Sequence, residues 1–175
     1  MAIDETQSFH PLNIAILTVS DTRTQETDTS GACLESRATA AGHNVVERRI
    51  LPDDIDALTS QLDAWASRSD VEVILTTGGT GVTGRDSTPE AVEAVGEKII
   101  PGFGELFRWL SYKNIGTSTI QSRAIAAVTR GTYIFALPGS TGACRDAWDG
   151  ILRDQLDIRH RPCNFAELIP RLREH

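Results

Sequence analysis

The chain has 175 residues, 40% of them hydrophobic, and 17 Lys and Arg against 24 Asp and Glu give a formal net charge of −7. This length suits one globular domain, and the acidic balance argues against a broad nucleic-acid-binding surface, which needs clustered cations. No apolar run reaches the roughly 18 residues needed to span a bilayer, and the opening residues MAIDETQSFHPLN lack the basic and apolar regions of a signal peptide. We expect a cytoplasmic protein with a small-molecule partner, no nucleic acid and no membrane association.

The spacing of cysteines and histidines predicts neither a disulfide framework nor a zinc site. The three cysteines are far apart and form no C-x-x-C pair, and the four histidines show no H-x-x-x-H spacing. We expect reduced, buried thiols and ordinary polar histidines.

In chain order, four apolar or β-branched runs predict strands, at Ile14–Val19, Val45–Leu51, Val71–Thr76 and Tyr133–Leu137. The runs IAILTV, VEVILT and YIFAL are almost continuously apolar, which is typical of parallel strands covered on both faces. The run VVERRIL is more mixed, so we expect it nearer an edge of the sheet.

Helical patterns lie between these strands. Thr29 or Ser30 can cap a first helix that Gly42 ends, and residues 55–66 predict a second, with its apolar residues on one face. After the fourth strand, a further helix places Trp148, Ile151, Leu152 and Leu156 on one face. The alternation of strands and helices predicts an α/β fold, a three-layer αβα sandwich with a mostly parallel, doubly wound sheet.

The boundaries and the stretch 98–131 are less regular. GFGELFRWLSYK predicts a helix, whereas SRAIAAV fits a helix or a short strand. We expect a flexible segment over residues 1–12, one domain over 13–170 and a tail over 171–175.

The stretch LTTGGTGVTGRDSTPEAV places four glycines directly after the third strand: Gly78, Gly79, Gly81 and Gly84. Ligands of parallel sheets bind beyond the carboxyl ends of the strands, and glycines with positive φ can turn successive N–H groups toward an anion. Ser87 and Glu90 have capping-box spacing, so a helix start faces the same loop. The sequence therefore predicts a phosphate site, although a flexible loop without a ligand is the simpler alternative.

Two well-known glycine motifs almost fit this loop. The G-x-G-x-x-G pattern is present, but it follows the third strand rather than the first, so the dinucleotide interpretation is weak and we expect no binding of nicotinamide cofactors. The G-x-x-x-x-G spacing of a P-loop is also present, but Arg85 and Asp86 replace the required Lys and Ser or Thr.

A second loop, LPGSTG, follows the fourth strand and contains Pro138, Gly139 and Ser140. Alone it is as consistent with an ordinary connection as with a ligand contact. Two such loops at neighbouring carboxyl ends predict a cleft.

Three charged residues near these loops have two interpretations each. Asp86 can hold Mg²⁺ against a phosphate or can be a first-turn acid that the helix dipole favours. Asp53, in LPDDIDAL, can share that role or cap the second helix. Arg85 can bind phosphate or be a solvated surface cation.

Taken in order, TVSD after the first strand, LPD after the second, LTTGGTG-x-x-x-RD-x-TPEA and LPGS resemble the MoaB/MogA family of molybdenum cofactor biosynthesis proteins. The resemblance covers about residues 13–170, and GFGELFRWLSYKNIGTSTIQSRA and DIRHRPCNF are similar to the MoaB branch. One departure is Ser87, where the family commonly has Val in RD-V-T-P; Ser supplies a hydroxyl that can cap the helix.

The resemblance implies a molybdopterin-binding fold and a site made of matching positions. It implies that Asp53 and Asp86 are catalytic and hold Mg²⁺. It implies nucleotide and phosphate binding by one set of residues and pterin binding by another. The first set is Thr77, Gly78, Gly79, Thr80, Gly81, Pro138, Gly139 and Ser140, and the second is Ser20, Asp21, Ser122 and Arg123.

The resemblance also implies an activity and an assembly. The expected reaction is adenylylation of the molybdopterin phosphate with Mg-ATP before metal insertion. The alternatives are a pterin-binding protein without transferase activity and, against the order of the motifs, an NAD-dependent oxidoreductase. The aromatic residues Phe103, Phe107, Trp109 and Tyr112 form either a satellite core or an interface. With the resemblance they favour a homotrimer or homohexamer, and other proteins of the pathway are possible partners.

Overall fold

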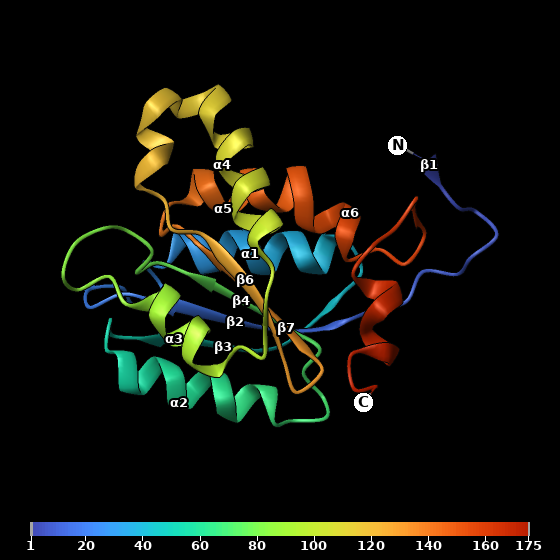
Figure 1. Cartoon of the computed structure of the whole chain (residues 1–175), viewed down its shortest axis with the longest axis horizontal. Helices are drawn as coiled ribbons and strands as arrows, with labels where there is room; N and C mark the ends of the chain where they lie inside the picture. Colours follow the sequence, from blue (N-terminus) through green and yellow to red (C-terminus); the bar gives the residue numbers. More distant parts are fainter. Residues whose placement is uncertain (1, 175) are drawn as a thin grey trace.

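A six-stranded sheet with strand order β3-β2-β4-β7-β6-β5 organises the computed structural model, which describes residues 2–174 (Figure 1). Four strands run parallel: β3 (Asn44–Leu51), β2 (Asn13–Val19), β4 (Val73–Thr77) and β7 (Thr132–Leu137). Strands β6 (Ile125–Thr129) and β5 (Lys98–Ile99) continue the sheet in antiparallel pairing. The four predicted strands are confirmed, β3 lies at an edge as its mixed composition indicated, and SRAIAAV contributes a strand.

Helices cover both faces of this sheet, which confirms the three-layer αβα prediction (Figure 1). One face carries α1 (Thr29–Ala40), α4 (Pro101–Ile115) and α5 (Thr141–Ala147), and the other carries α2 (Ile55–Ala66) and α3 (Thr88–Val95). Strand β2 shows why both faces are apolar. Ile14 and Ile16 pack in the first layer, whereas Ala15 and Leu17 pack in the second, because successive side chains of a strand point to opposite faces.

The helix after β7 is not uniform. It passes from α5 into a π-helical stretch, η2 (Trp148–Leu152), and ends as α6 (Arg153–Gln155). The apolar face predicted for it is buried. Two 3₁₀ helices complete the chain, η1 (Gly116–Gln121) directly after α4 and η3 (Ala166–Arg171) near the end.

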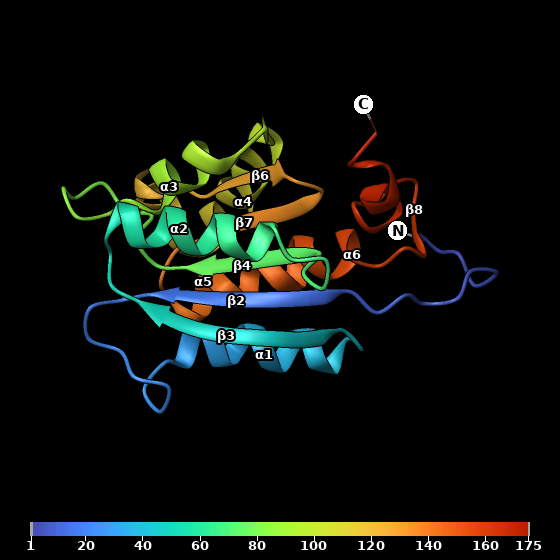
Figure 2. The ribbon, with the colours of Figure 1, turned by 90° about the horizontal axis from the view of Figure 1, so that it is seen from below.

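The two ends of the described chain lie on the same side of the molecule (Figure 2). Strand β1 (Ala2–Ile3) pairs antiparallel with β8 (His160–Arg161), and Leu12 is buried. Near the other end, Arg173 Nε donates to the Arg130 carbonyl over 3.1 Å. Parts of the segments expected to be loose are therefore attached to the domain.

Three local predictions differ from the structure. Asp28, not Thr29 or Ser30, caps α1, because its Oδ1 accepts from the Gly31 N–H at 2.9 Å. Of the three cysteines, Cys144 alone is buried, while Cys33 is half-buried and Cys163 exposed. Ser87 and Glu90 form no capping box, because each side chain bonds a residue from elsewhere in the chain. Within residues 2–174, no helix is long and apolar enough to cross a membrane.

Candidate functional site

A cleft of about 770 Å³ lies at the carboxyl ends of β4 and β7, where ligands of parallel sheets bind. Its floor is formed by the loops that follow these two strands. The end of α4 and η1, which project beyond the sheet in Figure 1, form one wall, and α5 forms another. The lining residues with polar side chains or loop positions include Gly78, Gly79, Thr80, Gly81, Asp86, Ser111, Asn114, Ser118, Thr119, Gln121, Ser122, Pro138, Gly139, Ser140, Arg145 and Asp146.

The glycines of the first loop allow the backbone to approach the protein's own atoms. Gly78 and Gly79 have φ of +106° and +63°, in the left-handed region that favours glycine. A Cβ on Gly79 would lie 2.6 Å from Asp53 Oδ2, and a Cβ on Gly81 would lie 2.7 Å from Asp86 Oδ2. Around Gly84 a Cβ would meet no atom within 4 Å. Gly81 and Gly84 do not take the positive φ that the glycine pattern suggested.

The two loops are joined directly, as the pair of small-residue loops predicted. The Gly78 N–H donates to the Leu137 carbonyl at 3.0 Å, and the Thr77 hydroxyl donates to the Pro138 carbonyl at 2.9 Å. Thr77 is fully buried, so its side chain ties the loops together from below. The cleft floor is thus one continuous backbone surface.

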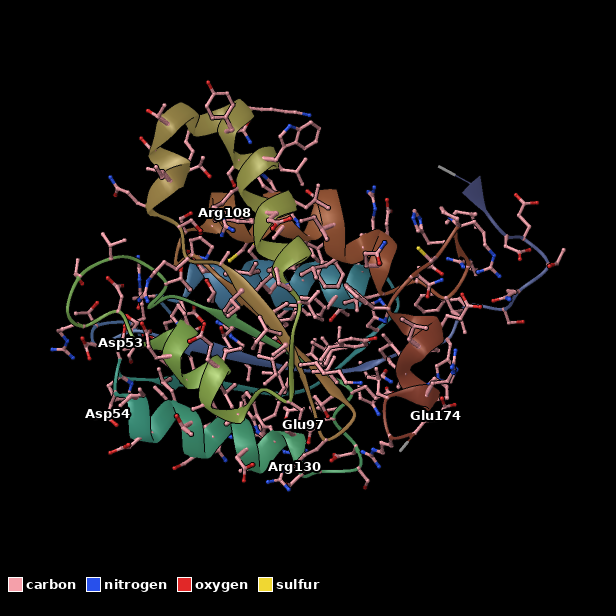
Figure 3. The ribbon with its side chains drawn as sticks, in the orientation of Figure 1. Asp53, Asp54, Glu97, Arg108, Arg130 and Glu174 are labelled. Carbon is pink, nitrogen blue, oxygen red and sulfur yellow. The ribbon has the colours of Figure 1, made fainter. Side chains whose placement is uncertain are left out.

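Asp53 does not line the cleft but lies against Gly79 of the first loop. Its Oδ1 accepts from the Ser87 hydroxyl at 2.6 Å and from the Ser87 N–H at 3.0 Å. The interpretation of Asp53 as the cap of the second helix is wrong, because Asp54 caps α2 by accepting from the Ala57 N–H at 2.9 Å. Figure 3 labels both acids at the side of the molecule where α2 begins. Asp53 is therefore available for a function that Asp54 does not share.

Asp86 is held in the same manner and lines the cleft. Its Oδ2 accepts from the Thr83 hydroxyl at 2.6 Å and the Thr83 N–H at 2.8 Å. These hydrogen bonds lower the pKa of the Asp86 carboxyl below its ordinary value, although partial burial opposes them. Because α3 begins at Thr88, Asp86 precedes the helix and is not a first-turn acid.

Ser122 lines the cleft, but Arg123 does not. Instead Arg123 holds the first loop: its Nε donates to the Gly81 carbonyl at 2.6 Å and its Nη2 to the Asp86 carbonyl at 2.8 Å, while its Nη1 pairs with Glu90. The structure therefore places Arg123 where it supports the backbone of the site rather than where it can reach the cleft interior.

Ser20 and Asp21 also lie outside the cleft, in a separate hollow at the ends of β2 and β3. The Ser20 hydroxyl accepts from the N–H groups of Thr22 and Arg23 at 3.3 and 3.2 Å. Asp21 pairs with Arg85 at 2.8 Å, which makes Arg85 a bridge between this hollow and the glycine loop. These two positions order the neighbouring loop in the structure.

Sequence reasoning missed several polar residues of the cleft, among them Asn114, Arg145 and Asp146. Asn114, at the end of α4, donates from Nδ2 to Asp146 Oδ2 at 2.7 Å, and Arg145 Nε lies 3.6 Å from Asp146 Oδ1. Arg145 and Asp146 follow the LPGSTG loop by about one helical turn, which is the signal that could have found them. Asn114 gave no signal, because its partner is 32 residues away in the sequence.

The family model described as "Probable molybdopterin binding domain" matches residues 15–158 of this chain. The chain belongs to this family.

Several members of the molybdopterin-binding domain family are similar over nearly their whole length. Molybdenum cofactor biosynthesis protein B of Escherichia coli (strain K12) is 53% identical over 157 residues, which cover 90% of this chain and 92% of that protein. The protein of the same name from Halalkalibacterium halodurans is 44% identical, with 89% and 94% covered.

Solved structures agree with this assignment. A crystal structure of a molybdenum cofactor biosynthesis protein B superposes with a TM-score of 0.87 at 39% identity, covering 97% of this chain and 100% of the other. The tungsten cofactor synthesizing protein MoaB from Pyrococcus furiosus gives 0.76 at 30% identity, with 94% and 98% covered. The fold resemblance to MoaB and MogA proteins is therefore confirmed.

The acids of this molybdopterin-binding domain fit the requirements of Mg²⁺. Each carboxylate has one oxygen held by a hydroxyl and an amide, and carboxylate oxygens are the hard ligands that Mg²⁺ prefers. Within residues 2–174, no three His, Cys, Asp or Glu side chains lie close enough together to hold a metal. Mg²⁺ at Asp53 and Asp86 would thus take its other ligands from phosphate oxygens and water, which is its usual preference.

Proposed function

We propose that this chain acts in molybdenum cofactor biosynthesis by binding molybdopterin in the cleft and transferring an adenylyl group from Mg-ATP to its phosphate. The observation that carries the proposal is the placement of two restrained carboxylates, Asp53 and Asp86, against Gly79 and Gly81 of the loop that forms the cleft floor. The names and close similarity of the relatives support the pathway.

In this reaction an oxygen of the molybdopterin phosphate attacks the α-phosphorus of ATP. A new P–O–P bond forms, and the bond from the α-phosphorus to the oxygen that bridges it to the β-phosphorus breaks. The electron pair leaves with pyrophosphate. Asp53 and Asp86 would hold Mg²⁺, which would supply charge neutralisation for the phosphate oxygens when bound.

The chain's own residues contribute position and electrostatics. The backbone N–H groups of residues 79–81, 139 and 140 can bind phosphate oxygens, which needs no side-chain motion. Thr83 and Ser87 orient the carboxylates of Asp86 and Asp53 through a hydroxyl and an amide each, and the Thr83 hydrogen bonds also lower the pKa of the Asp86 carboxyl. Arg123 fixes the loop carbonyls and so maintains the direction of the N–H groups.

One observation favours the second candidate, a protein that binds the pterin without transferring the adenylyl group. Among the described residues that line the cleft, Arg145 is the single Lys or Arg. The transition state of phosphoryl transfer carries several negative charges. A cleft with one cationic side chain therefore depends on a bound metal ion to stabilise that transition state.

Incubation of the purified full chain with molybdopterin and Mg-ATP, followed by chromatography of the products, tests the proposal. Adenylylated molybdopterin and pyrophosphate are expected in equal amounts. Tight binding of molybdopterin with no product would favour the second candidate, and failure to bind either substrate would contradict both.

We also propose that the chain assembles in the cytoplasm as a homotrimer or as a hexamer of two trimers. The aromatic cluster of α4 divides in a way that supports this: Phe103 and Phe107 are buried, whereas Trp109 and Tyr112 are 60% and 58% exposed. Ile120, in the adjoining η1, is 81% exposed. Exposed aromatic and aliphatic side chains gathered on one projection are typical of an interface.

A further inference from the structure

We propose that Asp146, held by Asn114, recognises the amino-pyrimidinone edge of the pterin ring, while the glycine loops take the phosphate at the other end of the same ligand. This assignment deepens the proposed function and depends on it, because it requires that the cleft bind a pterin phosphate. It differs from the expectation that Arg123 contacts the pterin, since Arg123 is occupied by the loop backbone.

The Asn114–Asp146 pair connects two walls of the cleft. Asn114 comes from the last turn of α4 and Asp146 from α5, and both line the cleft. The Asn114 amide donates to Asp146 Oδ2 at 2.7 Å, so a neutral donor fixes the direction of the carboxylate. Asp146 Oδ1 forms an ion pair with Arg145 Nε at 3.6 Å, which is beyond hydrogen-bond distance. Oδ1 thus keeps the capacity to accept a hydrogen bond from a ligand.

The position of Asp146 along α5 suits a ligand with two different ends. Ser140, in the second loop, and Asp146 are six residues apart, which corresponds to about 9 Å along a helix. A phosphate at the loops would place a ring attached through a short side chain near Asp146. The cleft is also lined by Phe107 and Ile115, which provide apolar surface that a ring can pack against.

The hydrogen-bonding pattern of a pterin matches a carboxylate. At one edge the 2-amino group and N3–H are adjacent donors, and an ionised carboxylate has only acceptors. Two parallel N–H bonds to a carboxylate are stronger and more directional than one. The corresponding lumazine carries a carbonyl oxygen at position 2, which would face Asp146 with an acceptor against an acceptor. A site built on Asp146 should therefore reject the lumazine.

The test uses two probes that differ only at position 2: the phosphate ester of 6-hydroxymethylpterin and that of 6-hydroxymethyllumazine. Calorimetric titration of the full chain should show preference for the pterin by about tenfold, which corresponds to about 1.4 kcal/mol, because an acceptor of the ligand would face an acceptor of the protein. In Asp146→Asn the amide oxygen can still accept from Asn114, and the new NH₂ group can donate to the lumazine carbonyl. The preference should fall to near unity or reverse.

Asp149→Asn is the matched control. Asp149 is three residues further on, pairs with Arg37 on α1 at 3.1 Å, and does not line the cleft, so its substitution should leave the preference unchanged. If Asp146→Asn does not fold, Asn114→Ala replaces it, and loss of the restraint on Asp146 should reduce the preference several-fold.

The outcomes separate this assignment from the function on which it rests. If the wild-type chain binds molybdopterin but does not distinguish the probes, or if Asp146→Asn keeps the wild-type preference, the pterin subsite is elsewhere and the proposed function still stands. If the wild-type chain does not bind molybdopterin, the proposed function fails and this assignment fails with it.

Discussion

Replacing Gly79 by Ala should destabilise the protein, because the structure leaves no room for a side chain there. The φ of +63° costs a residue with a Cβ roughly 1–2 kcal/mol. The new Cβ would also overlap Thr88 Oγ1 and approach Asp53 Oδ2 to 2.6 Å. Displacing Thr88 breaks its 2.9 Å hydrogen bond to the Gly78 carbonyl, at a further cost of about 1 kcal/mol. The expected loss in the free energy of unfolding is therefore about 2–4 kcal/mol.

Urea denaturation of Gly79→Ala and Gly84→Ala measures this difference. Gly84 is the control, because its φ is not positive and a Cβ would meet no atom within 4 Å, so its substitution should change stability by less than about 0.5 kcal/mol. In a thermal melt the first variant should lose roughly 4–16 °C. Equal stability of the two variants would refute the argument that close packing against Asp53 and Thr88 requires a glycine at position 79.

Three further predictions concern other parts of the molecule. Ser87→Val should remove the 2.6 Å hydrogen bond from the Ser87 hydroxyl to Asp53 but keep the 3.0 Å hydrogen bond from the backbone amide. Adenylyl transfer should therefore slow by about tenfold with little change in ATP affinity. An unchanged rate constant would show that the hydroxyl does not orient Asp53. Burial lowers the pKa of His43 to about 4, so its contribution to stability is full above pH 6.5 and is lost, by up to about 3 kcal/mol, as the pH falls toward 4. Urea titrations at pH 7.5 and 4.5 should show a steeper loss for the wild type than for His43→Gln, and equal slopes would contradict this. Trp109→Ser should weaken self-association in light scattering, whereas a stable 19.0 kDa wild-type monomer at micromolar concentration would contradict the proposed oligomer.

Periodicity and local chemistry predicted most of the fold. Helix α2 occupies residues 55–66 as expected, because its apolar spacing and its preceding acids are local signals. Strands β2, β4 and β7 were recognisable because burial on both faces requires nearly continuous apolar sequence. The choice between helix and strand for SRAIAAV could not be made locally, since its pairing with β7 is a tertiary contact.

The site was less predictable, because its hydrogen bonds join distant segments. Asp53 and Asp54 are adjacent and chemically identical, and only the contact with Ser87, 34 residues away, distinguishes their roles. The same limitation hid the support that Arg123 gives to the glycine loop, and it hid the Asn114–Asp146 pair. The two small-residue loops were found because carboxyl ends of parallel strands share one edge of the sheet, whatever the side chains.

The most direct test of the central claim compares adenylyl transfer by Asp86→Asn, Asp53→Asn and Asp54→Asn. Substitutions at Asp86 and Asp53 should reduce the rate constant by about 10²-fold or more, because loss of a carboxylate that holds Mg²⁺ against phosphate costs several kcal/mol in the transition state. Binding of molybdopterin should be nearly unchanged. Asp54→Asn retains a side chain that caps α2 and should transfer at the wild-type rate. Near-normal turnover in Asp86→Asn, at an unchanged melting temperature, would contradict the assignment of the catalytic acids.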